Sequence, residues 1–167
     1  MPFTPYHFGP GLAIKAVMPS QFSFTIYCYA QVITDLESGY HLLYGDFPVH
    51  RFFHTYLGAA LVGGFCAVTG RPLFQWTLRQ LQRGLAMEVR EGRNWAMISW
   101  PCAFLSALIG TLSHVFLDSL MHSDMTPFAP WSAANPMLHL ISVPALESLC
   151  LALGIVGGVT CLTLKRF

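Results

Sequence analysis

Three apolar segments of membrane-spanning length constrain the fold of this chain more than any other feature. They cover residues 53–70, 96–121 and 140–163, and a helix that crosses a bilayer needs about 20 predominantly apolar residues. Of the 167 residues, 54% are hydrophobic and only 10% are charged, against about 25% charged in an ordinary soluble domain. The sequence therefore predicts an all-α, polytopic membrane helical bundle with three full crossings, formed as a single domain over residues 1–167.

The first 52 residues allow two interpretations. Two apolar stretches, 8–18 and 22–34, are separated by Pro19-Ser20, and each is too short to cross a bilayer alone. A re-entrant hairpin would bring His7 and Asp35 to the same side, whereas a single kinked crossing would separate them. We favour the hairpin because it brings His7 to the other polar residues. The opening residues MPFTPYHFGPG have no basic n-region, so we expect no signal peptide.

The basic residues predict the orientation of the chain. The 71–95 loop carries five arginines, and Lys165-Arg166 follow the last apolar segment. Cytoplasmic loops are enriched in lysine and arginine, so both regions are predicted to face the cytoplasm of a bacterial inner membrane. Within this loop Phe74, Leu78, Leu81 and Leu85 recur at helical spacing, which favours an amphipathic helix on the inner leaflet.

The loop over residues 122–138 is then predicted to lie on the outer side. It contains three prolines, which make it stiff and non-helical. It also carries Phe128 and Trp131, aromatic residues that suit the headgroup layer. We expect this loop to form a lid over a functional site, with Asp124 reaching back toward that site; a plain connector is the alternative.

A stripe of ionisable residues ends the second apolar segment. His114, Asp118 and His122 are spaced i, i+4 and i+8, which places them within about 80° of arc on one helical face. His50 and His54, in the motif HRFFH, share the i, i+4 spacing and precede the first crossing. Ionisable groups in membrane helices are costly and usually functional. The sequence therefore predicts a metal site near the outer leaflet.

The candidate ligands combine imidazole and carboxylate groups, a mixture that suits zinc, manganese or iron. In chain order they are His7, Asp35, Glu37, His50, His54, His114, Asp118 and His122. This set exceeds one tetrahedral zinc and fits one or two ions, with a carboxylate bridging the pair. Glu37 or Asp124 is the expected general base, and Arg51 could hold a phosphoryl oxygen. Hydrogen bonding at the headgroup interface is the alternative role for these residues.

The order of these motifs resembles the membrane-bound metal-dependent hydrolases known as LexA-regulated inner-membrane proteins. The matching stretches are PYH, TDLES, HRFFHT and SHVFLD, and they extend over the whole chain. Where that family often has D-x-D-H, this chain has Asp35-Leu36-Glu37-Ser38. A weaker likeness, in order only, is to zinc-dependent phospholipase C. The resemblance implies a membrane-embedded metal site.

These features favour a hydrolase in which metal-bound hydroxide attacks a lipid phosphoester, with membrane lipids as partners. A metal-dependent lipid amidase or esterase is one alternative, and a metal-binding transporter or sensor is another. Transporters usually carry internal repeats, and none is evident here. The net charge of +1 gives no nucleic-acid signature. The five cysteines form no CxxC pair and are expected to be buried thiols.

Overall fold

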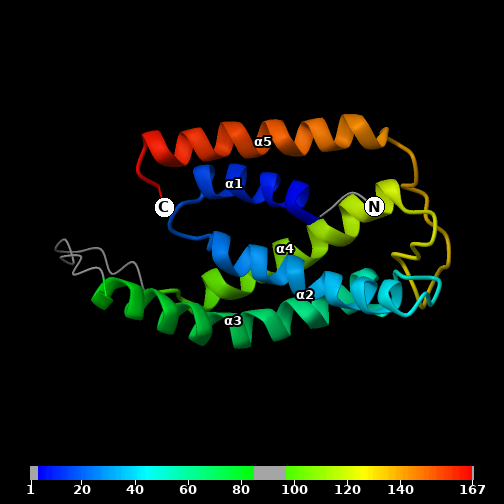
Figure 1. Ribbon diagram of the computed structural model, residues 1–167, viewed down its shortest axis with the longest axis horizontal. Coiled ribbons are helices and arrows are strands. Elements are labelled where there is room, and N and C mark those ends of the chain that lie inside the picture. Colours follow the sequence, from blue (N-terminus) through cyan, green and yellow to red (C-terminus); the bar gives the residue numbers. More distant parts are fainter. Residues whose placement is uncertain (1–3, 85–96, 167) are drawn as a thin grey trace.

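The computed structural model describes residues 4–84 and 97–166, and within them the fold is all-helical (Figure 1). Two short 3-10 helices, η1 and η2, precede α1 and α3. The elements in chain order are η1 (Thr4–His7), α1 (Phe8–Val17), α2 (Phe24–Leu43), η2 (Phe52–His54), α3 (Tyr56–Gly84), α4 (Trp100–Met121) and α5 (Val143–Thr163).

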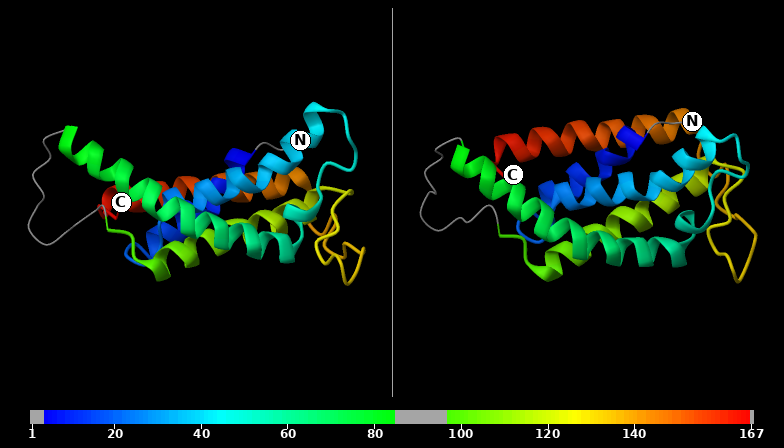
Figure 2. Two further views of the ribbon diagram at one scale, coloured as in Figure 1. Left: turned by 90° about the horizontal axis from the view of Figure 1, so that it is seen from below. Right: turned by 60° about the horizontal axis from the view of Figure 1, so that its bottom comes forward.

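Successive helices run in alternating directions along one long axis (Figures 1 and 2). The loops that join α2 to α3 and α4 to α5 therefore meet at one end of the bundle, together with η1. We call this the loop end. The last turns of α3 and α5 lie at the opposite end (Figure 1), so the arginines of α3 and the Lys165-Arg166 pair share one side, as the predicted orientation requires. Which side faces the cytoplasm stays a prediction.

The three predicted crossings are confirmed as helices long and apolar enough to span a membrane, and they identify a membrane protein. They are Tyr56–Leu81, Trp100–Met121 and Val143–Thr163. Pro101 and Pro144 each lie in the first turn of a helix, where the missing N–H group costs no intrahelical hydrogen bond. The Ser99 hydroxyl accepts from the Cys102 N–H and so caps α4.

The N-terminal hairpin is also confirmed. Helix α1 leaves the loop end and α2 returns to it (Figure 1), after a turn that contains Pro19 and Ser20. The Lys15 ammonium donates to the carbonyls of Pro19, at 2.7 Å, and Phe22, at 3.0 Å, and so stabilises this turn. Helix α2 continues to Leu43, well past the predicted end at residue 34, because the polar residues of TDLES extend the helix as part of its buried face.

The prediction of a loop over residues 71–95 is wrong for residues 71–84. Residues 71–84 continue α3 without a break, through Pro72. Phe74, Leu78 and Leu81 are therefore helical, as their amphipathic spacing indicates, but they belong to the crossing helix α3 rather than to a separate surface helix. Phe74 and Leu78 pack against the core, which explains why the helix does not end at Gly70. Leu85 lies outside the described residues.

Small side chains form the centre of the bundle between α2, α3 and α4. The largest cluster includes Ala30, Ala67, Ala103 and Ala107 with Ile26, and small residues let membrane helices approach closely. Helix α5 packs instead on α1, where a Cβ at Gly9 would meet the Cys150 carbonyl and one at Gly157 would meet the Leu12 backbone. This backbone-to-backbone contact fixes the position of η1 and therefore of His7.

Candidate metal centre

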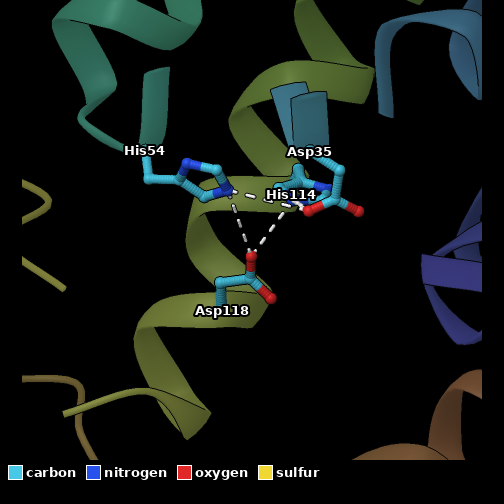
Figure 3. A group of neighbouring side chains, drawn as sticks. All are labelled: Asp35, His54, His114 and Asp118. Atoms are coloured by element: carbon cyan, nitrogen blue, oxygen red, sulfur yellow. Dashed lines mark ion pairs between the residues drawn. The ribbon is translucent and has the colours of Figure 1, made fainter. Parts of the chain in front are cut away.

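Two carboxylates and two histidines from three elements converge near the loop end (Figure 3). Asp35 comes from α2, His54 from η2, and His114 and Asp118 from α4, and their ligand atoms all lie within 4.8 Å of one another. Nε2 of His114 is 3.2 Å from Oδ1 of Asp35 and 3.0 Å from Oδ2 of Asp118. The i, i+4 spacing on α4 aligns the last two residues on one helical face. This group could hold a metal ion.

The ring nitrogens of the buried histidines fit a metal. The Nε2 atoms of His7, His54 and His114 are buried and face the carboxylates of Asp35 and Asp118, but they make no hydrogen bond of regular geometry within the described residues. A buried polar atom without a partner costs about 1–3 kcal/mol, and native proteins keep such atoms for a reason. An imidazole Nε2 is a common ligand of zinc, iron and manganese. The donor set therefore fits a divalent transition metal.

A second group lies beside the first and shares Asp118 with it. Its members are His50, Asp118 and His122. Oδ2 of Asp118 faces His54, at 3.7 Å, and His114, whereas Oδ1 faces His7, at 3.6 Å, and His122, at 3.8 Å. His7 thus lies next to the shared carboxylate, with its ring 4.9 Å from that of His114. Asp118 is placed between two clusters of histidines, as a bridging carboxylate would be.

Three histidines of these groups, His50, His54 and His114, each contact an acceptor through Nδ1, the ring nitrogen opposite Nε2. The Nδ1 atom of His54 lies 3.2 Å from Oε2 of Glu37, and that of His50 lies 2.9 Å from Oδ1 of Asp124. His114 makes the corresponding contact with the amide oxygen of Gln31 at 2.5 Å. An acceptor at Nδ1 fixes the tautomer and turns Nε2 toward a metal.

The structure places Glu37 and Asp124 behind two of these histidines. Glu37 is outside both groups, and its Oε2 atom also accepts from the N–H groups of Arg51 and Phe53. Asp124 likewise accepts from the N–H groups of Val49 and His50. Glu37 and Asp124 each orient a histidine, and backbone N–H groups in and next to the HRFFH segment donate hydrogen bonds to their oxygens.

The ionisation of these residues suits that role. Partial burial acts to raise the pKa of Glu37, but the hydrogen bond and charge of His54 hold it below its usual value. His50 and two backbone N–H groups outweigh burial in the same way at Asp124, and its pKa is also lowered. Burial lowers the pKa of His7 to about 4 and also lowers that of His122. Glu37 and Asp124 are thus charged at neutral pH, whereas His7 and His122 are neutral.

Arg51, the residue predicted to hold a phosphoryl oxygen, contacts other protein groups in the structure. The Arg51 guanidinium makes an ion pair with Asp46 at 2.8 Å and donates to the Pro48 carbonyl. His41 contacts the same carboxylate at 3.0 Å. Arg51 therefore lies in an exposed polar cluster with Asp46 and His41.

The 122–138 loop covers the cluster as a packed roof. Met125 and Pro127 are buried, and the Pro127 carbonyl accepts from the Tyr56 N–H at 2.8 Å. The Asn135 amide donates to the Ser119 carbonyl at 2.9 Å. Asp124 does reach back, as predicted, but to His50 rather than to the interior of the cluster. These contacts describe a fixed cover, while Phe128 and Trp131 remain exposed as expected.

Gln31 is the residue of the site that the sequence prediction missed. Its side chain is fully buried, and its amide nitrogen donates to the Ser113 hydroxyl at 3.3 Å. That hydroxyl lies 3.4 Å from the phenol of Tyr27, which donates to the His7 carbonyl. Its position in the sequence, four residues before Asp35 in an otherwise apolar stretch, could have indicated a buried role at the site.

The model of one protein family, described as a domain of unknown function (DUF4184), matches residues 1–164. The chain belongs to the DUF4184 family. That match covers every residue of the two groups and the residues that hold them. No curated protein and no solved structure matches this DUF4184 chain.

Proposed function

We propose that this protein is a metal-dependent hydrolase with its centre at the outer face of a bacterial inner membrane. The observation that carries the proposal is the convergence of three buried histidine Nε2 atoms with the carboxylates of Asp35 and Asp118. Zinc is the first choice of ion, with manganese and iron as alternatives. One ion would be held by the first group, and the second group offers a place for another.

The two groups differ in the number of ligands that the protein supplies. The first offers four side chains, whereas the second offers His50, Asp118 and His122, so an ion held by the second group would have fewer protein ligands and could also bind water or substrate. When bound, a divalent metal lowers the pKa of coordinated water to about 7 and polarises the bond that is cleaved. Glu37 and Asp124 would keep His54 and His50 in the tautomer that this requires.

Asp35 is the carboxylate best placed to receive a proton. Its side chain is 28% exposed, whereas that of Asp118 is 4% exposed. One oxygen faces His114, and the other is turned away from the cluster (Figure 3). As the more exposed carboxylate of the group, Asp35 could accept the proton of an attacking water.

A phosphoester is the proposed substrate bond. Paired ions that share a carboxylate stabilise both the attacking and the leaving oxygen of a phosphoryl group. The shared position of Asp118 supports such a pair. Cleavage of a carboxylic ester or amide is the competing reaction, and a substrate panel separates the two.

The test combines metal analysis with soluble substrates. Purified protein should contain zinc or another divalent transition metal and should hydrolyse bis(4-nitrophenyl) phosphate in a chelator-sensitive manner. Asp118→Asn should abolish both, whereas Asp46→Asn, a carboxylate outside both groups, should change neither. Turnover of 4-nitrophenyl butyrate alone would favour an esterase. A metal-free protein with no turnover would overturn the proposal.

A further inference from the structure

The cluster is closed on most sides and opens on the flank of α2. The side chains of His54 and His114 are fully buried, and those of His7 and Asp118 are 4% exposed. Asp35 is the group member with the most exposed side chain, and it lies eight residues before Leu43, the last residue of α2. That distance is about 12 Å of helix. The opening is therefore on the side of the helix and not at its end.

The roof described above covers the cluster from the loop end. Met125 packs against Ala59 of α3 and Val115 of α4, and the hydrogen bond from Tyr56 to Pro127 holds the loop against the start of α3. A substrate that came straight down the bundle axis on this side would have to displace buried side chains. On the flank of α2, by contrast, the side chain of Asp35 is 28% exposed.

A glycine leaves open space beside Asp35 on the side of the loop end. Gly39 lies one turn after Asp35, within about 40° of the same helical face. A Cβ added at Gly39 would meet nothing within 4 Å, so no packing contact requires a glycine there. Glycine inside a helix is less favourable than alanine by about 1 kcal/mol. The space beside Asp35 is therefore not filled by a side chain of residue 39.

An apolar surface leads from Asp35 toward the opposite end of the bundle. Val32, one turn before Asp35, is exposed. Cys28 lies seven residues before Asp35, within about 20° of the same face, and is half-buried. Along this side of α2, the open space at Gly39 is followed by the carboxylate of Asp35 and then by the apolar side chains of Val32 and Cys28. A molecule with a polar head and a hydrocarbon chain has the same order of groups.

We propose that the substrate is a membrane lipid that reaches the centre sideways, through the flank of α2. Its headgroup would occupy the space at Gly39, its scissile bond would face Asp35, and its chain would lie along Val32 and Cys28. This inference rests on the proposed hydrolase function and names its substrate class. It also assigns Gly39 a role in substrate specificity.

The test uses a lipid-like probe whose binding needs no turnover. Hexadecylphosphonic acid carries a metal-binding head and one chain, and a diazirine in that chain allows photo-crosslinking to the zinc-loaded protein in phosphatidylcholine nanodiscs. Crosslinks should map to α2 around Val32 and Cys28. An excess of unlabelled hexadecylphosphonate should suppress them, whereas the same concentration of methylphosphonate should not.

Gly39→Leu provides the decisive variant and Gly64→Leu its control. Both glycines are half-buried helix residues at which a Cβ meets nothing within 4 Å, so both variants should fold and retain metal. Gly39→Leu should reduce crosslinking by about tenfold, because a clash with the bound headgroup opposes binding. Gly64→Leu, on α3, should leave it unchanged.

The outcomes separate this inference from the proposed function. Crosslinks on residues 126–134, or equal crosslinking in both variants, would overturn the sideways route while leaving a metal-dependent hydrolase intact. If the wild-type protein binds no metal and cleaves no soluble phosphodiester, the proposed function fails and the lipid route fails with it. If Gly39→Leu loses only lipid-probe binding and still cleaves bis(4-nitrophenyl) phosphate, both proposals are supported.

Discussion

The Nδ1 atom of His54 lies 3.2 Å from Oε2 of Glu37, so that the opposite nitrogen of the ring faces Asp35 and Asp118. Glu37 also holds two N–H groups of the segment that carries His54. A single carboxylate therefore fixes both the backbone and the ring of this histidine. The chain positions a ligand here before any ion arrives.

Removing that carboxylate should weaken metal binding without removing a ligand. Glu37→Ala is expected to lower zinc affinity by about 10- to 100-fold, because the imidazole loses the acceptor that orients it. Glu37→Gln, which keeps an acceptor, should lose less. A chelator-competition titration measures the affinity. Asp46→Asn serves as the control, and an unchanged affinity in Glu37→Ala would contradict the positioning role.

The two groups should lose metal independently, except at the residue they share. His50→Ala and His122→Ala each touch only the second group, so each should release one equivalent and retain the other. Asp118→Asn should lower the occupancy of both positions. Mass spectrometry of metal content against protein concentration gives the stoichiometry. Loss of all metal in His122→Ala would mean that the groups form one site.

Gln31 should matter through its amide oxygen. Gln31→Leu removes the amide oxygen 2.5 Å from Nδ1 of His114 and leaves only the more distant Nδ1 of His7, at 3.4 Å; a poorly paired buried donor costs about 1–3 kcal/mol. The variant should therefore bind zinc more weakly and unfold at a lower temperature. Gln31→Glu restores an acceptor and should recover the affinity. Equal affinity in Gln31→Leu and the wild-type protein would show that His114 needs no positioning.

The pH dependence of stability should change when metal is removed. Burial acts to lower the pKa of His54, but Asp35 and Glu37 outweigh it and raise that pKa above 6.5. This contribution to stability is complete below pH 6.5 and is lost as the pH rises through the raised pKa. The lowered pKa of Glu37 contributes above its usual 4.5 and is lost as the pH falls. Metal-free protein should thus be most stable between these two values.

Zinc should move that optimum upward, because its histidine ligands must be neutral to bind. Melting temperatures of chelator-treated and zinc-loaded protein, measured from about pH 4 to about pH 8, test both statements. Parallel curves for the two forms would contradict the coupling between metal binding and His54 ionisation.

The predicted orientation can be tested with single cysteines in a variant that lacks the five native ones. Gln80→Cys lies near the end of α3, and Ser132→Cys lies in the roof loop; both positions are exposed. An impermeant maleimide added to intact cells should label position 132 and not position 80. The reverse pattern would place the metal centre on the cytoplasmic side.

Periodicity and hydropathy predicted much of this fold because they act locally. The three crossings follow from apolar length, and His114 and Asp118 share a face because their spacing matches the helical repeat. The hairpin of α1 and α2 was predicted from the need to gather polar residues. The continuation of α3 past Gly70 was not, because Pro72 and the arginines suggested a break that packing of Phe74 and Leu78 overrides.

The candidate ligands were identified more easily than their roles. Residue type and spacing selected Asp35, His54, His114 and Asp118, but they could not distinguish a carboxylate inside the cluster from one behind a histidine. Glu37 and Asp35 are only two residues apart, yet one backs His54 and the other belongs to the group. That difference depends on how the HRFFH segment folds around the end of α2, which is a tertiary contact.

The residues that meet at Asp118 are spread from His7 to His122 along the chain. During synthesis, His7 therefore cannot meet all of these residues until the chain has been made at least as far as residue 122. Helix α5 contributes to neither group, yet it is the helix that packs on α1 and holds His7 in position. Metal binding would then be the last step of assembly, because it would require all the described helices to be packed together.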